Sequence, residues 1–196
     1  MLDMWYPRMA DIPGISFTGS PGIKRSELSN AGVRPRTDHG YIAWPSASGT
    51  TSASPAHDRA FADLSRLSRG ELVRWVWEGL ELPGLPSDYH FLLQGAVKQL
   101  WSGHRDAPEG LHFLEVFGYL DLALIEAAPQ TVRLPDTHPT GGFVHVTSLE
   151  LLLSLLEREG AVREALELSG RAAKFGVLHR REDLKAKVAS LDEEQA

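Results

Sequence analysis

The sequence predicts a mainly α-helical protein in which antiparallel helical hairpins stack as a bundle or a short solenoid. Apolar residues recur at helical spacing from residue 57 onward, and capping signals begin several of the periodic segments. Gly160 separates two such segments by a turn so short that the helices must be antiparallel. We therefore expect two parts: an extended arm at residues 1–56 and a helical domain at residues 57–196.

The arm has a composition of its own. Proline, glycine, serine and threonine supply 24 of its 56 residues. Such a segment buries too little apolar area to offset the entropy of ordering the backbone, about 1–2 kcal/mol per residue. It also carries the aromatic residues Trp5, Tyr6, Phe17, Tyr41 and Trp44. Two interpretations follow: a partly disordered tail, or an arm that aromatic anchors pin to the helical body or to a partner.

Start signals divide the next segment into helices. Ser54 places a capping hydroxyl before Pro55 at the first helical position. Ser68 and Glu71 match a capping box, in which each side chain bonds the backbone N–H of the other residue. Ser87 is expected to cap the helix that follows.

The longest apolar segment is expected to form a buried helix. It runs from Leu111 to Ala128, is opened by the sequence Asp106-Ala-Pro-Glu109, and ends before Pro129. Four ionisable residues interrupt it, and these make it a poor membrane span: His112, Glu115, Asp121 and Glu126.

Residues 130–146 interrupt the helical pattern. β-type runs at 131–134 and 143–146 flank a segment rich in proline and glycine, which predicts a small β-hairpin or a structured loop insertion. Long ordered connections between helices are disproportionately functional. We therefore expect a special surface of the domain here.

The last part of the chain returns to helical periodicity. Thr147 and Glu150 match a second capping box, and Val146 and Leu151 occupy the positions of a hydrophobic staple across it. The expected helices cover residues 147–159, 161–176 and about 180–191.

Residues 155–172 resemble a tetratricopeptide repeat, and the resemblance extends to about residues 147–176. Gly160 stands at the turn, and Ala165 and Ala172 stand where the second helix of that family needs small side chains. Ser169 departs from the family, which usually has a large side chain there. The resemblance implies a helical hairpin with a concave surface that binds a peptide or a partner protein, and it implies no catalysis.

Several side chains are candidates for binding. The insertion supplies aromatic and imidazole groups, and two consecutive arginines form a basic cluster near the last helix. Trp77 lies about 200° around its helix from Trp75, so we expect one of the two to meet a second surface, such as the arm or a subunit. The binding candidates are Trp77, His138, Phe143, His145, Arg180 and Arg181.

A metal site is the alternative chemistry. His112 and Glu115 lie three residues apart on one helix face, and imidazole and carboxylate groups suit zinc or another divalent ion. Further ligands would come from His90, His104, His138 and His145. The competing interpretation leaves both side chains partly exposed, or paired with Arg74 or Arg105. Left buried and unpaired, Glu115 would have a raised pKa and become a candidate acid or base.

Other chemistries find little support in the sequence. The absence of cysteine excludes disulfides and thiolate-bound zinc. No nucleophile elbow or phosphate-binding loop is present, so no catalytic residue and no cofactor are predicted. The net charge of −6 would repel a polyphosphate, which disfavours nucleic acid as a partner. The first 20 residues lack a secretory signal pattern, so we expect a cytoplasmic protein without a membrane span.

The favoured function is a protein interaction or scaffolding module that engages a protein, a peptide or a second copy of itself. The alternatives are a metal-dependent enzyme centred on His112 and Glu115, and a regulatory protein associated with nucleic acid through the arm and Arg180-Arg181.

Overall fold

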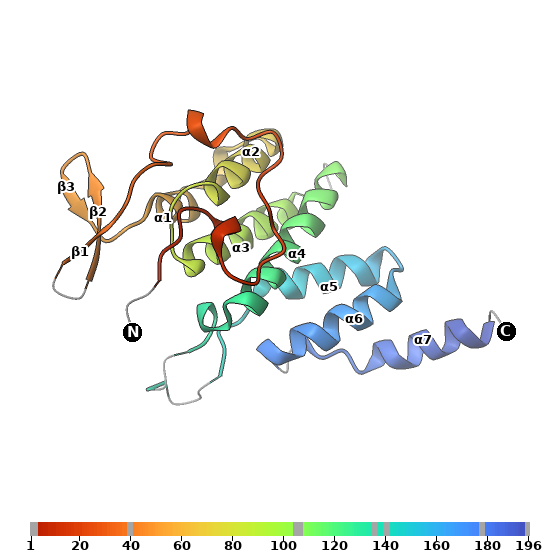
Figure 1. The fold of residues 1–196 in the computed structure, drawn as a ribbon. Helices are drawn as coiled ribbons and strands as arrows, with labels where there is room; N and C mark the ends of the chain where they lie inside the picture. The colour runs from red at the N-terminus through yellow and green to blue at the C-terminus, as the bar shows by residue number, and fades with distance from the viewer. Residues whose placement is uncertain are drawn as a thin grey trace.

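The computed structural model describes residues 4–38, 41–103, 108–134, 137–138, 142–176 and 179–194. Within these ranges the protein is mainly helical and has one small antiparallel sheet (Figure 1). The strands are β1 (Arg36–Asp38), β2 (Tyr41–Ser46) and β3 (Gly49–Thr51). The α-helices are α1 (Pro55–Ala60), α2 (Arg69–Leu80), α3 (Pro86–Ser102), α4 (Leu111–Ala127), α5 (Thr147–Arg158), α6 (Val162–Ala172) and α7 (Asp183–Glu194). Short 3-10 helices are η1 (Met9–Asp11), η2 (Arg25–Glu27), η3 (Leu64–Arg66), η4 (Pro108–Gly110), η5 (Pro129–Thr131) and η6 (Ala173–Phe175).

Helices that follow one another in the chain pack against one another. α1 and α2 lie on α3, and α3 forms its largest helix contact with α4. From there α4 packs on α5, α5 on α6, and α6 on α7, which is the last element (Figure 1). No helix in the described residues is long and apolar enough to cross a membrane.

Two of the predicted helix starts are confirmed, and two are wrong. The hydroxyl of Ser54 accepts a hydrogen bond from the backbone N–H of His57, and Ser68 and Glu71 form the predicted capping box. The predicted cap at Ser87 is wrong, because α3 begins one residue earlier, at Pro86. The carboxylate of Asp88 accepts instead from the backbone N–H of Leu85, the residue before the helix, at 2.9 Å.

The capping box predicted at Thr147 and Glu150 is also wrong. α5 begins at Thr147 itself and has no side-chain cap. The backbone N–H of Thr147 donates to the amide oxygen of Gln94 on α3 at 2.8 Å, while the carboxylate of Glu150 pairs with His145 at 2.9 Å. Tertiary partners have therefore replaced the local cap.

The insertion contains a short antiparallel pairing, as one of the two interpretations predicted. Arg133 and Phe143 form an isolated β-bridge. The backbone N–H of Leu134 donates to the carbonyl of Gly142 at 2.9 Å, and that of Val144 donates to the carbonyl of Val132 at 2.7 Å. The tip of the insertion, residues 135–136 and 139–141, lies outside the described residues.

A fully buried polar network joins three helices inside the apolar core. Asp121 of α4 accepts a hydrogen bond from Nδ1 of His90 on α3 at 2.7 Å and another from the hydroxyl of Ser148 on α5. All three side chains are inaccessible to solvent. A buried carboxylate is costly unless its hydrogen bonds are satisfied, so this network specifies how α3, α4 and α5 face one another.

The N-terminal arm is laid over the helices (Figure 1). Tyr6 and Gly84 exchange two backbone hydrogen bonds, at 2.8 and 3.0 Å. Packing against α1 requires glycine at 84, because a Cβ atom there would lie 2.6 Å from the Cβ of Ala56. The carboxylate of Glu81, only 2% exposed, accepts from the backbone N–H of Ser20 at 2.7 Å and pairs with Arg8 at 3.3 Å.

An aromatic anchor completes the attachment of the arm. The ring of Phe17 is buried and stacks on Trp77 of α2, with ring centroids 6.3 Å apart and planes 10° from parallel. Trp77 also meets Phe117 of α4 edge to face at 4.9 Å. Of the two tryptophans Trp75 and Trp77 on α2, Trp77 is therefore the one that meets the arm.

The small sheet lies within the segment that composition described only as an arm. β2 pairs antiparallel with both β1 and β3. Trp44 of β2 is buried and meets Trp5 edge to face at 5.7 Å, which ties the sheet to the start of the arm. The sequence analysis did not predict these strands, because they are only three to six residues long and are flanked by glycine and serine.

Replacing Ser148 with alanine should destabilise the protein, because the variant leaves the buried carboxylate of Asp121 with one donor fewer. We expect the free energy of unfolding to fall by about 1–3 kcal/mol in urea denaturation. Ser154→Ala on the same helix is the matched control. That hydroxyl bonds only the carbonyl of Glu150 in its own helix, so a change of less than about 0.5 kcal/mol is expected. Equal effects would contradict the structural role of the network.

Replacing Phe17 with alanine should detach the arm from α2. Removal of a buried aromatic ring is expected to cost about 3 kcal/mol of unfolding free energy and to alter the fluorescence of Trp77, the ring that Phe17 covers. Thr18→Ala, at the exposed neighbouring position, should change neither quantity. Unchanged fluorescence in the Phe17 variant would contradict the docking of the arm.

Candidate functional site

The outer face of α4 forms an open, mainly apolar groove with a volume of about 360 Å³. Val116, Tyr119, Leu120 and Ala123 supply its apolar floor. Its remaining lining comes from His112 and Glu115 of α4 and from Ser16 of the arm.

The sequence of α4 explains why a groove forms there. Apolar residues occupy nearly the whole circumference of this helix, and the packed face is fixed by the buried carboxylate of Asp121. Leu114, Phe117 and Ile125 are buried on the same side. The opposite side is therefore left apolar and only partly covered, which is unusual for a helix face that meets water.

The arm forms one wall of the groove. Ser16 lies beside the floor, between the buried anchors Ile12 and Phe17. Close approach of the arm to α4 is also seen at Gly14, where a Cβ atom would lie 3.9 Å from the Cβ of Ala127.

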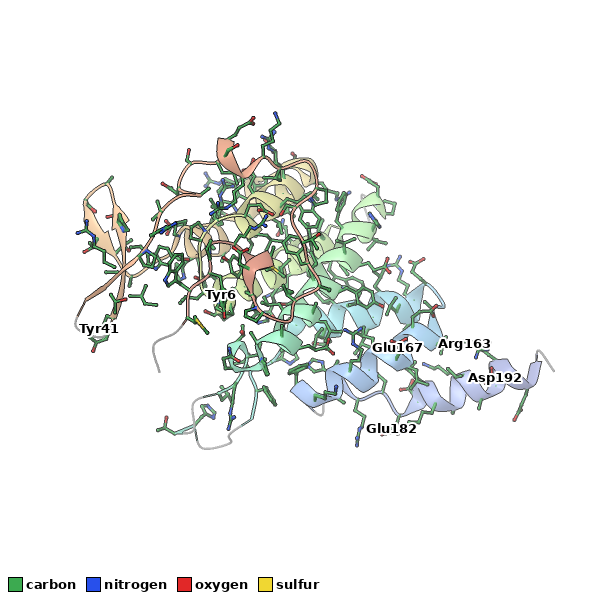
Figure 2. The ribbon with its side chains drawn as sticks, in the orientation of Figure 1. Tyr6, Tyr41, Arg163, Glu167, Glu182 and Asp192 are labelled. Carbon is green, nitrogen blue, oxygen red and sulfur yellow. The ribbon has the colours of Figure 1, made fainter. Side chains whose placement is uncertain are left out.

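α6 lies close to the same region of α4. The guanidinium of Arg171 on α6 donates two hydrogen bonds to the carboxylate of Glu126 on α4, at 3.1 and 2.7 Å. This pair raises the pKa of Arg171 and lowers the pKa of Glu126, chiefly through the hydrogen bonds. Bidentate pairing of this kind also fixes the position of α6 relative to α4. Figure 2 shows Arg163 and Glu167 on α6 and Asp192 on α7.

Tyr119 is one of the residues of the groove floor, and charged groups of α4 and α6 act on its hydroxyl. Burial is the first cause that raises the pKa of its hydroxyl, and the carboxylate of Glu115 raises it further. Arg171 opposes this effect, while Glu167 and Glu164 of α6 add to it. A phenolate is disfavoured here first by burial and then by the carboxylate of Glu115. The site therefore combines an apolar floor with one carboxylate and one imidazole in its lining.

The two residues predicted as metal ligands both line this groove. His112 is exposed and Glu115 is half-buried. The predicted pairing with Arg74 is wrong, because Arg74 pairs with Glu78 on its own helix at 2.8 Å. Within the described ranges, no group of three or more His, Asp or Glu side chains is arranged to hold a metal ion.

The further histidines proposed as ligands are scattered. His90 is committed to Asp121 in the core, and His145 pairs with Glu150. His138 is exposed in the insertion, and His104 and Arg105 lie outside the described residues.

Most of the predicted binding residues gather elsewhere, where the insertion meets the linker between α6 and α7. Phe143 packs edge to face on Phe175 at 5.6 Å, and His145 stacks on His179 at 6.2 Å with planes 18° apart. Arg181 pairs with Glu157 of α5 at 3.4 Å, while the exposed Arg180 pairs with Glu182 at 3.5 Å. These residues join elements together, and Trp77 lies apart from them beneath the arm.

The sequence analysis missed the groove floor, although a signal for it is present. Val116, Tyr119, Leu120 and Ala123 follow the spacing of one helical face, i, i+3, i+4 and i+7. Because the opposite face of the same helix is also apolar, periodicity alone does not tell which of the two faces is covered.

Acid should destabilise the region around His179, where the insertion meets the linker between α6 and α7. Burial is the first cause that lowers the pKa of His179, and neighbouring His145 and Arg181 lower it further, while Glu150 opposes them. The folded state therefore takes up this proton less readily than the unfolded chain, whose histidine pKa is about 6.5. The stability that the neutral ring provides should be complete above that value and decline as the pH falls below it.

The measurement is urea denaturation of the full chain between about pH 7.5 and pH 5. His179→Gln cannot take up this proton and should show a shallower decline below about pH 6.5. An equally steep decline in this variant would assign the acid sensitivity to another group. His112→Gln, at an exposed position of α4, is the matched control and should behave as the unaltered protein.

Comparison with known proteins identified no relative of this chain. No protein-family model matches the chain, no curated protein matches it, and no solved structure matches it. A proposal for its function therefore depends on the groove and its lining.

Proposed function

We propose that this protein is an interaction module that binds a peptide segment of a partner protein in the groove along α4. The observation that carries the proposal is the partly covered apolar floor of Val116, Tyr119, Leu120 and Ala123. Contiguous apolar surface at the edge of a concave site is typical of recognition surfaces. Its length also suits a peptide, since residues 112–123 span about 17 Å along the helix axis at 1.5 Å per residue.

We further infer that α3 to α6 form a short stack of two antiparallel hairpins. The large contact between α3 and α4, and the short turn at Gly160 between α5 and α6, support this arrangement. The resemblance of residues 155–172 to a tetratricopeptide repeat supports it too, because small side chains occur there at Ala165 and Ala172, both buried. A stack of this type presents a surface for a protein or peptide partner.

Substituting the floor should abolish peptide binding without unfolding the protein. A random peptide library displayed on phage is selected on the full chain, and the recovered peptides are synthesised. Their affinity for the double variant Val116→Ser and Leu120→Ser should fall by about tenfold or more, because apolar anchors at such sites contribute about 1–3 kcal/mol each.

Phe91→Ser is the matched control, since Phe91 is an exposed apolar residue of α3 outside the groove lining. It should leave the affinity unchanged. Circular dichroism should show both variants folded, because every substituted side chain is at least partly exposed. Selected peptides that bind the floor variant as well as the unaltered chain would contradict the proposal.

A further inference from the structure

A second cavity, with a volume of about 310 Å³, lies between the arm and the helices α1 and α2. Its lining comes from residues 22–24 and 27–29 of the arm, from Arg59 of α1, and from Arg74 and Glu78 of α2. The cavity shares no lining residue with the groove on α4. A ligand bound here would therefore be separate from the peptide of the proposed function.

The arm wall of this cavity is held in place by Arg25. Its guanidinium donates hydrogen bonds to the backbone carbonyls of Pro7, Ala31 and Glu81, the last of which ends α2. The nearby backbone N–H of Ser20 donates to the buried carboxylate of Glu81. These bonds fix the arm segment on the end of α2, so the cavity is formed before any ligand arrives. A preformed site loses little free energy to ordering on binding.

The lining of the cavity is locally positive. It contains the three cations Lys24, Arg59 and Arg74 against the two carboxylates Glu27 and Glu78, which leaves one positive charge in excess. Lys24 pairs with Glu27 at 3.1 Å, while both arginines share Glu78, at 3.1 Å from Arg59 and 2.8 Å from Arg74. The chain as a whole has a net charge of −6, but contact distances are shorter than the screening length of about 8 Å, so the local charge decides what binds.

The two guanidiniums keep donors for a further acceptor. Each has five N–H groups, and Glu78 engages only Nη2 of Arg59 and Nε of Arg74. Trp75 fixes the position of Arg59. The guanidinium carbon lies 3.8 Å from the centre of the indole ring, and the indole N–H donates to the carbonyl of Arg59 at 3.0 Å. An acceptor in the cavity would thus meet donors that are already oriented.

The placement of the cations indicates the class of ligand. They come from the arm, α1 and α2, so they border the cavity from three separate elements. A tetrahedral oxyanion presents oxygens in three directions, whereas the two oxygens of a carboxylate lie in one plane. We propose that this cavity binds the phosphate group of a small phosphate monoester through Lys24, Arg59 and Arg74. Ile23 and Leu28, which also line the cavity, supply an apolar surface for the organic part.

The test is isothermal titration calorimetry of the full chain with inorganic phosphate, at an ionic strength held constant with sodium chloride. Saturable binding with a dissociation constant of about 1 mM or lower is expected. Acetate should bind about tenfold more weakly or worse, and phenyl phosphate should bind more tightly than inorganic phosphate because its ring gains the apolar surface. Absence of saturable phosphate binding would overturn the proposal. Acetate that binds as tightly as phosphate, or phenyl phosphate that binds no more tightly, would overturn the assignment to a phosphate monoester.

Removal of two cations of the cavity provides the decisive variant. Lys24→Gln with Arg74→Gln should weaken phosphate binding by about tenfold or more, and both side chains are mainly exposed, so the variant should fold. Arg180→Gln with Lys185→Gln is the matched control, because these exposed cations also share one carboxylate, that of Glu182, and lie outside the cavity. The control pair removes the same net charge and should leave the affinity within about twofold. Equal weakening by both pairs would overturn the proposal.

The variant of the groove floor, Val116→Ser with Leu120→Ser, separates this site from the proposed function. It should bind phosphate as the unaltered chain does while it loses the selected peptides. Loss of phosphate binding in the floor variant would contradict the location of the phosphate site between the arm, α1 and α2.

Discussion

The hydrogen-bonded carboxylate of Asp121 is the constraint on which the arrangement of the helices depends. It is inaccessible to solvent and is satisfied by His90 of α3 and Ser148 of α5. An apolar core would tolerate several rotations of a helix as uniformly hydrophobic as α4, but a buried carboxylate tolerates only the rotation that satisfies it. The network thereby decides which apolar face of α4 enters the core and which face remains as the floor of the groove.

Contacts of the arm and of α6 with neighbouring helices are found beside the groove. The arm is secured at Glu81 and by the ring of Phe17, and it passes beside the floor at Ser16. On α6, Arg171 is paired with Glu126 of α4, next to the groove. Two features that are unrelated in the sequence, a glycine- and proline-rich arm and a charged helix, therefore lie against the same helix, α4.

The cluster at the insertion has a different character. Its aromatic and imidazole groups are engaged with one another across three elements, through Phe143 with Phe175 and His145 with His179. The buried His179 is also linked to α6 through its carbonyl oxygen, which accepts from the hydroxyl of Ser169 at 2.8 Å. Ser169 thus serves the connection to α7, because its side chain bonds the backbone of residues 179 and 181 in the linker.

The sequence alone determined the features that depend on neighbours in the chain. The caps at Ser54 and Ser68, the turn at Gly160 and the helix ending before Pro129 follow from local hydrogen bonding and backbone conformation. Only the tertiary structure decided the rest, as at Thr147, where a distant amide from Gln94 replaced the local cap. The groove belongs to the same class, because it forms where the arm borders a face of α4 without covering it. Contacts between residues far apart in the chain set that outcome, and periodicity within one helix carries no information about them.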